Sequence, residues 1–488
     1  MSKFNYRFVL NAVGLVMLVE AVFMVISGFV GLSFGENVTK YIYLSAIITA
    51  SVGGFLIFLG EHQRRKSSHI TKREVYITVT FVWLTLTVFG TFPYLLSGAI
   101  STFTNAFFES ICGFTTTGSS TILNIEAFPK SLLFWRSFTQ WIGGVGIIIF
   151  VLSFMPIFGA ASGQVYDAEA TGIAEDVFRP RIKEITTTIA YTYLGLTFVG
   201  FLALWAGPMN AFDAACHSFS AISTGGFSTK QSSIAYFNSP YVEYVITVLM
   251  FLGGTNFMLI SGLFTKFSMS LFKSEEFRWY FWIIIIFTFV ISVTLSATGQ
   301  MKGIENTFRT VLFQVVAAVT TTGFATADFV AWGPFYWLLF LSLILFCACE
   351  GSTSGGMKIS RLIVLSKNTV LVFKRQVHPN ALYMVKINGK IISDEVLSKV
   401  MSFVFLFVAL AIFGATVLTL TGLNFEESIS ISISSLSNYG FGLGSFGPSG
   451  SFESATTFTK YFMAFLMLVG RLEIFTVISL FVPGFWKR

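Results

Sequence analysis

The chain has 488 residues, of which 54% are hydrophobic and 11% are charged, and its mean hydropathy is +0.75. These values lie far outside those of soluble proteins, and the long apolar runs can each cross about 30 Å of hydrocarbon. The net charge of +7 does not indicate nucleic-acid binding, because the basic residues cluster in loops between apolar runs. The composition therefore predicts a polytopic membrane protein.

The distribution of basic residues predicts the orientation of the chain. Most of the 31 lysines and arginines lie in the first seven residues, in the last two, and in four loops: 61–74, 157–184, 263–278 and 358–399. By the positive-inside rule these segments and both termini are cytoplasmic. The first apolar run begins near Phe8 without a small-residue cleavage site, which favours a retained helix over a signal peptide.

The first predicted unit, residues 1–66, is a pair of spans at about 8–30 and 41–60. Residues 72–157 follow a different order: a span at 74–96, a short apolar segment at 103–114, the run GFTTTGSS, and a span at 131–155. Glycine and clustered threonine favour irregular backbone, which persists at membrane depth only where protein covers it or where it lines a water-filled path. We expect the short segment to be a half-helix that enters from the outer face and stops.

The same order returns three times, in residues 180–265, 276–376 and 394–488. The short segments 211–222, 306–319 and 425–436 precede the runs STGGF, TTTGF and NYGFG. We align the four runs on Gly118, Gly225, Gly323 and Gly440. The predicted fold is all-α, with four tandem helix–pore half-helix–helix repeats around one pseudo-fourfold pore, plus the two extra N-terminal helices.

Such runs can form a cage for a desolvated cation. Successive carbonyls replace the hydration shell, a glycine at positive φ lets them line up, and the carboxyl end of each half-helix favours positive charge. Oxygen ligands suit a hard monovalent ion. The predicted filter residues are Thr116, Thr117, Gly118, Ser223, Thr224, Gly225, Thr321, Thr322, Gly323, Asn438, Tyr439 and Gly440.

A second repeated feature is glycine in each closing helix, at Gly143–Gly144, Gly253–Gly254, Gly351 and Gly470. Close helix packing through small residues is the simplest interpretation in repeats one and two. In repeat three the interruption is CEGSTSGGMK (349–358), which we expect to be an intramembrane loop that acts as a flap under the filter. Its spacing approaches a phosphate-binding pattern, but Met357 occupies the lysine position, which argues against nucleotide binding.

In repeat four Gly470 is followed by Arg471, near the middle of the expected closing helix. A charge so placed costs at least about 2.5–3.5 kcal/mol. One interpretation is a structural pair with Glu350 or Glu473. The other is a positive charge facing the water-filled path, where it repels cations and forms part of a gate.

Two other classes of membrane protein fit the sequence less well. A transporter of an organic solute usually has inverted or paired repeats and a midplane site, whereas these repeats share one orientation. An intramembrane enzyme needs a catalytic dyad or a metal cluster, which the scattered histidines do not supply. The four cysteines have no metal-ligand spacing and are expected to be buried thiols: Cys112, Cys216, Cys347 and Cys349.

The chain resembles the Trk/Ktr/HKT superfamily of potassium transporters, and within it the bacterial TrkH type. The resemblance rests on GFTTTGSS, STGGFST, TTTGF, GSTSGGMK and LVGRLEIFTV (468–477), and on the extra N-terminal helix pair. It implies potassium uptake across the bacterial inner membrane, filter ligands at the twelve positions above, and a homodimer. It also implies a gate formed by an intramembrane loop and an arginine: Gly351, Ser352, Thr353, Ser354, Gly355, Gly356 and Arg471.

The resemblance further implies a cytoplasmic nucleotide-binding subunit of the TrkA type, controlled by ATP, ADP or NAD. The longest cytoplasmic stretch, 358–399, is too short for such a domain, so this chain is expected to carry K⁺ as cargo and no organic cofactor. The basic stretch 367–390 is a candidate docking surface. Two alternatives stay open: symport of K⁺ with H⁺ or Na⁺, and a poorly selective K⁺/Na⁺ permease, because the second glycine of a TVGYG filter survives only as Gly442.

Overall fold

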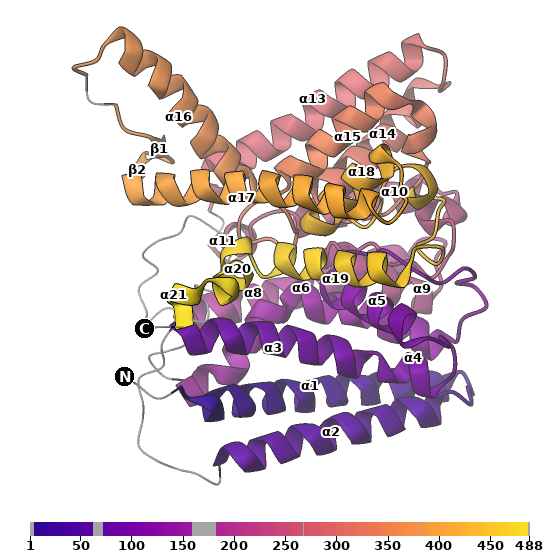
Figure 1. Ribbon diagram of the computed structural model, residues 1–488. Helices are drawn as coiled ribbons and strands as arrows, with labels where there is room; N and C mark the ends of the chain where they lie inside the picture. Colours follow the sequence, from indigo (N-terminus) through magenta and orange to yellow (C-terminus); the bar gives the residue numbers. More distant parts are fainter. Residues whose placement is uncertain (1–3, 62–71, 159–181, 267, 382, 487–488) are drawn as a thin grey trace.

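The computed structural model describes residues 4–61, 72–158, 182–266, 268–381 and 383–486. In these residues the fold is all-α apart from one short hairpin (Figure 1). Six helices are long and apolar enough to cross a membrane, and two further pairs pass the same test with a sharp bend between their members. The expected unit boundaries at 66, 180 and 488 lie outside the described residues.

The N-terminal pair, α1 (Tyr6–Ser33) and α2 (Thr39–Glu61), lies along one side of the molecule against α3 and α6 (Figure 1). The two helices approach closely through small residues. A Cβ added to Gly14 would lie 2.6 Å from the carbonyl oxygen of Gly53. This is the packing that small residues permit between helices in lipid.

The remaining helices fall into four successive groups. The first contains α3 (Lys72–Gly90), α4 (Phe92–Leu96), α5 (Phe103–Phe114) and α6 (Lys130–Phe158). The second contains α8 (Ile182–Trp205), α9 (Ala211–Ile222), α10 (Pro240–Gly253) and α11 (Phe257–Lys266). The third contains α13 (Glu275–Ala297), α14 (Ile304–Val319), α15 (Pro334–Phe346) and α16 (Ile359–Val377). The fourth contains α17 (Asp394–Thr419), α18 (Phe425–Ser437), α19 (Thr457–Arg471) and α20 (Ile474–Ile478). Short α12 (Ser270–Lys273) and α21 (Pro483–Trp486) follow α11 and α20.

Three of the four half-helices begin at good capping residues, whereas α14 follows Gly303, which has no side chain to cap it. The side chain of Thr102 accepts the amide of Asn105 at the start of α5, and Asn210 accepts the amide of Asp213 at the start of α9. At α18, Asn424 and Glu427 form a capping box. These bonds satisfy amides that a helix start otherwise leaves unpaired, so these three half-helices are set locally by sequence.

The closing helices of three repeats are broken and do not form continuous spans. The axis bends by 107° between α10 and α11, and by 115° between α19 and the segment that α20 begins. In repeat three, α15 stops at Phe346, and the flap, residues 347–358, leads to α16. The closing segments of repeats two and four are therefore broken helices and not continuous spans. Glu473, just after the second break, has a φ of 63°, which an α-helix does not contain.

Helix α16 projects from the body of the molecule (Figure 1). A small antiparallel hairpin follows it, formed by β1 (Lys386–Ile387) and β2 (Lys390–Ile391). The hairpin was not expected from the sequence, although its turn, Asn388–Gly389, is a strong hairpin signal. Both turn residues have positive φ, 50° and 80°.

Candidate functional site

The four half-helices end in the same way. One or two residues after each helix terminus, one residue has positive φ: Thr116 (55°), Thr224 (52°), Thr321 (54°) and Asn438 (57°). The next amide donates to the carbonyl five residues earlier, with N–O distances of 2.8–2.9 Å for Thr117→Cys112, Gly225→Ser220, Thr322→Ala317 and Tyr439→Ser434. This is a helix-ending turn that pairs otherwise orphaned carbonyls. The hydroxyl-rich runs are thus four copies of one backbone structure.

The four turns meet in a closed ring through their glycines. Gly118, Gly226, Gly323 and Gly440 have φ values of 84°, 80°, 74° and 99°. A Cβ on each would lie 2.0–2.3 Å from a carbonyl oxygen of the next repeat, in the order Gly118–Gly225, Gly226–Thr322, Gly323–Tyr439 and Gly440–Thr117. Real atoms cannot approach so closely. Positive φ and the lack of space together require glycine at these four positions.

This ring corrects the sequence alignment in repeat two. The residue equivalent to Gly118 is Gly226, not Gly225, and the equivalent layer is Thr224–Gly225–Gly226. Ser223 is the C-cap of α9, as Thr115 is of α5. The run STGGF offers two adjacent glycines, and the helix terminus rather than the glycine pattern fixes the register.

Carbonyl oxygens without protein donors surround the ring. Within the described residues, no hydrogen bond is made to the carbonyls of Thr116, Thr117, Thr224, Thr321, Thr322, Asn438 and Tyr439. All seven residues are buried. Buried carbonyls are almost always paired, so this group is prepared for a partner that the protein does not supply. Water or a cation can fill that role.

The threonine hydroxyls of the runs make contacts with other side chains. Thr117 Oγ1 lies 2.8 Å from Thr115 Oγ1, and Thr322 Oγ1 lies 2.7 Å from Thr320 Oγ1. Repeat four departs from this pattern, because Asn438 Nδ2 donates to Thr117 Oγ1 at 3.1 Å and to the Met467 carbonyl at 3.0 Å. The oxygen cage is therefore mainly backbone.

A polar clamp from α6 holds the filter run of repeat two. Gln140 Nε2 donates to the Gly225 carbonyl at 2.6 Å, and its Oε1 accepts the Phe227 amide at 3.0 Å. The Gly440 carbonyl of the ring also has a side-chain donor, because Ser119 Oγ donates to it at 2.8 Å. Gln140 could not be recognised from the sequence, because nothing in the spacing connects it to a run 85 residues away.

A buried ion pair braces the same region. Arg136 pairs with Glu109, and both side chains are at most 2% exposed. Glu109 also accepts the Thr121 amide at 3.1 Å, while Arg136 donates to the Ser228 carbonyl at 3.0 Å and lies over the Phe227 ring. Each charge is thus satisfied, as burial demands. The pair ties the run of repeat one to that of repeat two.

The flap lies against the carboxyl ends of the half-helices. Thr353 Oγ1 donates to the carbonyls of Ile222, at 2.8 Å, and Gly253, at 3.1 Å. The Gly355 amide donates to Thr321 Oγ1 at 2.9 Å. A Cβ on Gly355 would lie 2.3 Å from the Ser437 carbonyl oxygen. The flap therefore touches repeats two, three and four directly at the inner end of the ring.

Arg471 provides a side chain at a position where repeats one and two have glycine. Gly143, Gly253 and Gly470 each pack against the end of their own half-helix, with added-Cβ distances of 1.8, 2.9 and 2.1 Å to its carbonyls. The next residue is Gly144 in repeat one, Gly254 in repeat two and Arg471 in repeat four. The guanidinium donates to the carbonyl of Thr353 at 2.9 Å and to that of Gly143 at 2.7 Å. It links the flap to repeat one.

The two carboxylates considered as partners of Arg471 have other contacts. Glu473 pairs with Arg361, with Nη2–Oε1 at 2.6 Å. Glu350 accepts the hydroxyl of Ser360, and its amide donates to Glu276 Oε1 at 2.6 Å. Among the expected gate residues of the flap, the bonds printed for the Arg471 guanidinium reach Thr353.

Comparison with known proteins agrees with this geometry. The TrkH family, described as cation transport proteins, matches residues 38–488. A Trk system potassium uptake protein TrkH of Escherichia coli K12 is 33% identical over 491 aligned residues, covering 99% of this chain and 100% of that protein. Its Salmonella typhimurium counterpart is 32% identical with the same coverage. The crystal structure of the potassium transporter TrkH from Vibrio parahaemolyticus matches with a TM-score of 0.89 and 30% identity, covering 100% of both chains.

Proposed function

Because the chain belongs to the TrkH family of cation transport proteins, we propose that it takes up K⁺ across the bacterial inner membrane through the ring of filter carbonyls. The observation that carries the proposal is the group of seven buried carbonyls that have no donor among the residues that the structure describes. The names of its relatives, potassium uptake proteins, support the choice of ion.

The ring acts as a replacement for the hydration shell of the ion. A K⁺ ion loses water on entry, and carbonyl dipoles take the place of that water without burying fixed negative charge. The carboxyl ends of α5, α9, α14 and α18 point their partial negative charge at the same centre. The ligand set is the twelve residues predicted from sequence, with Gly226 in place of Ser223 in repeat two.

The flap and Arg471 form the gate in this proposal. The flap crosses the inner end of the ring, and the guanidinium places a positive charge beside it. A cation leaving the ring meets both a steric block and electrostatic repulsion. Opening requires the bonds from Thr353 to repeat two and from Arg471 to the flap to break, so any effector must favour the state without them.

The asymmetry of the ring favours a second candidate, a poorly selective K⁺/Na⁺ permease. The Gly225 carbonyl is shared with Gln140, and Asn438 replaces the threonine of the other three repeats. A cage with unequal walls discriminates by size less sharply than one with four equal walls. Coupling of K⁺ to H⁺ or Na⁺ is the remaining alternative.

The regulatory partner and the dimer belong to the same proposal. Figure 1 shows the start of α1 and the short α21 at one edge of the molecule, which supports two cytoplasmic termini. Helix α16 projects with Phe373 63% exposed and Val377 71% exposed, among basic side chains. Such a surface suits a second copy of this chain and a cytoplasmic nucleotide-binding subunit of the TrkA type.

The decisive experiment is measurement of reversal potentials of the purified protein in liposomes. Gradients of K⁺, Na⁺ and H⁺ are varied one at a time. A potential that follows K⁺ alone supports channel-like K⁺ uptake. A potential that follows Na⁺ equally supports the permease, and one that shifts with the pH gradient supports coupling. No response to K⁺ overturns the proposal.

A further inference from the structure

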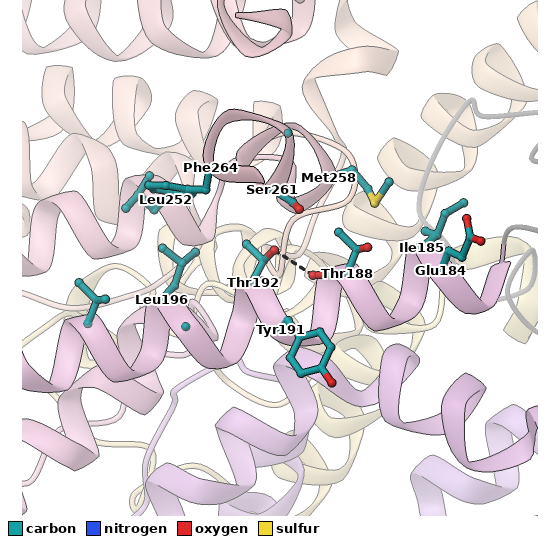
Figure 2. Close-up of a pocket in the computed structure, with 13 residues that line it drawn as sticks. Glu184, Ile185, Thr188, Tyr191, Thr192, Leu196, Leu252, Met258, Ser261 and Phe264 are labelled. Carbon is teal, nitrogen blue, oxygen red and sulfur yellow. Dashed lines mark hydrogen bonds between the residues drawn. The ribbon is translucent and has the colours of Figure 1, made fainter. Parts of the chain in front are cut away.

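A crevice lies between α8 and the bent pair α10–α11, and none of its described lining residues belongs to the ring or the flap. Its volume is about 990 Å³, and it is lined by α8 from Glu184 to Val199, by Leu252 of α10, and by Met258 and Phe264 of α11. Figure 2 shows Glu184 and Ile185 at one end and Leu196 and Leu252 at the other. Because α8 is a membrane span, lipid surrounds this face.

The lining has one polar end and a long apolar body. Among the described residues that line it, Glu184 carries the only charge, and Glu184 is exposed at the start of α8. Thr192, further along, donates its hydroxyl to the Thr188 carbonyl at 2.8 Å, which leaves mostly methyl and aliphatic surface facing the crevice. The residues from Glu184 to Val199 extend roughly 22 Å along α8 at 1.5 Å per residue. That length matches an extended acyl chain, not a compact solute.

Two glycines leave space in the lining. A Cβ on Gly195 would meet nothing within 4 Å, and one on Gly262 would meet only Ser270 Oγ, at 3.8 Å. These glycines are not explained by helix contact, unlike Gly200, whose Cβ would lie 3.0 Å from Leu249. The lining is open to the surroundings of the protein, since Phe264 is 66% exposed and Val199 60%.

We propose that this crevice binds a phosphatidylethanolamine molecule, with one acyl chain along α8 and the ammonium of its headgroup at Glu184. Charge complementarity selects the headgroup: a carboxylate at the mouth attracts an ammonium and repels a lipid of net negative charge. The apolar body supplies the affinity, at about 0.8 kcal/mol per buried CH₂. The site is distinct from the ion path and does not depend on the proposed transport function.

The test is native mass spectrometry of delipidated protein titrated with phosphatidylethanolamine or phosphatidylglycerol of the same chains. Gly195→Leu and Gly262→Leu add side chains at positions where a Cβ meets no atom closer than 3.8 Å, and each should weaken phosphatidylethanolamine binding at least tenfold. The matched control is Gly54→Leu on α2, because Gly54 is also exposed on a span and its Cβ would meet nothing within 4 Å. It should bind as the wild type does.

A separate variant, Glu184→Gln, tests whether the ammonium of the headgroup contacts Glu184. Glu184→Gln should bring the affinities for the two lipids to within about twofold, while the wild type prefers phosphatidylethanolamine. Equal binding of both lipids by the wild type, or unchanged preference in the variant, overturns the ammonium contact. Wild-type affinity in both glycine variants overturns the site. If these variants change the monomer–dimer ratio and not lipid binding, the crevice is an interface between copies and the proposal is wrong.

Discussion

At the scale of single residues, the ring glycines give the sharpest prediction. Gly226→Ser and Gly323→Ser should each lower the K⁺ over Na⁺ permeability ratio several-fold without preventing insertion, because the new Cβ displaces a carbonyl that is 2.0 or 2.3 Å away. Ion flux into liposomes measures the ratio. Gly98→Ser is the matched control, since Gly98 has φ of 71° but open space around it.

Variants of the two adjacent glycines in repeat two test which register is correct. The structure assigns Gly226 to the ring, whereas the sequence alignment used Gly225. If Gly226→Ser kept the wild-type ratio, the closed ring would not be the selective element. The comparison with Gly225→Ser is informative as well, because a Cβ on Gly225 meets the Gln140 side chain at 2.4 Å, not a carbonyl of the ring. A side chain can move aside, so this variant should retain more selectivity.

A second residue-scale prediction concerns Glu20 in α1. Its side chain is 1% exposed, and within the described residues neither carboxylate oxygen has a hydrogen-bond partner. An isolated buried carboxylate is very costly when ionised, so the acid is expected to be neutral. Glu20→Gln, with the same shape and no charge, should leave the free energy of unfolding within about 1 kcal/mol. Thermal unfolding in detergent at neutral pH measures this. A much larger loss would mean that the carboxylate is ionised and holds a cation or ordered water.

The sequence could identify the threonines and three of the four ring glycines, because local turn chemistry demands those residue types. It could not identify Gln140 or the pair Arg136–Glu109. These polar residues lie in apolar helices and contact a filter run or a helix that is distant in sequence. Their partners become visible only when the repeats are assembled.

At the scale of elements, the flap should be held shut by individual bonds. Thr353→Val keeps the shape but removes the hydroxyl that donates to Ile222 and Gly253, and should raise basal K⁺ flux about two- to tenfold, since such a bond contributes about 0.5–1.5 kcal/mol. Arg471→Ala should also raise flux, because it removes both a tether and a repulsive charge. Flux into liposomes without any partner is the measurement.

The neighbouring flap residue Ser352 provides a control for Thr353. Ser352 Oγ donates to the Cys349 carbonyl at 2.5 Å, which is a bond within the flap. Ser352→Ala should therefore change basal flux less than Thr353→Val does. Unchanged flux in well-folded Thr353→Val and Arg471→Ala proteins would favour a purely structural role for both side chains.

The bounds of two half-helices could be predicted from local sequence, whereas the breaks in the closing helices could not. The expected segments 103–114 and 211–222 coincide with α5 and α9, because a capping residue opens each and a glycine turn closes it. The breaks in the closing helices could not be assigned in the same way. Gly143 and Gly253 occupy equivalent positions, yet α6 continues through the first while α10 ends at the second. Contact with the flap, where the Phe257 amide donates to Gly351 at 3.1 Å, distinguishes them.

At the scale of the whole molecule, the prediction concerns the surface around α16. Lys374 is exposed, whereas Arg375 already donates to the Tyr383 carbonyl at 2.5 Å and Lys367 pairs with Glu275. Lys374→Glu should therefore weaken co-purification of an acidic regulatory subunit, and Lys374→Glu with Arg375→Glu should weaken it further. Co-purification from native membranes, at matched expression, measures the effect.

The control for this surface is Lys302→Glu. Lys302 is an exposed lysine in the connection between α13 and α14, at the far end of α13 from Glu275. The charge change is the same, so it should leave co-purification unchanged. Equal loss in both variants would show that net charge matters and not a docking surface on α16.

The closed ring has a consequence for biogenesis. Its last contact joins Thr117 to Asn438 and Gly440, residues more than 320 positions apart. At about 5–20 residues per second, a ribosome needs roughly 15–65 s to add that much chain. During that time repeat one sits in the bilayer with its hydroxyl run uncovered, at a point where lipid cannot hydrogen-bond to it. Insertion machinery or a membrane chaperone has to shelter this nascent intermediate, and a ribosome that stalls before Gly440 leaves a fragment that membrane proteases can recognise by its open ring.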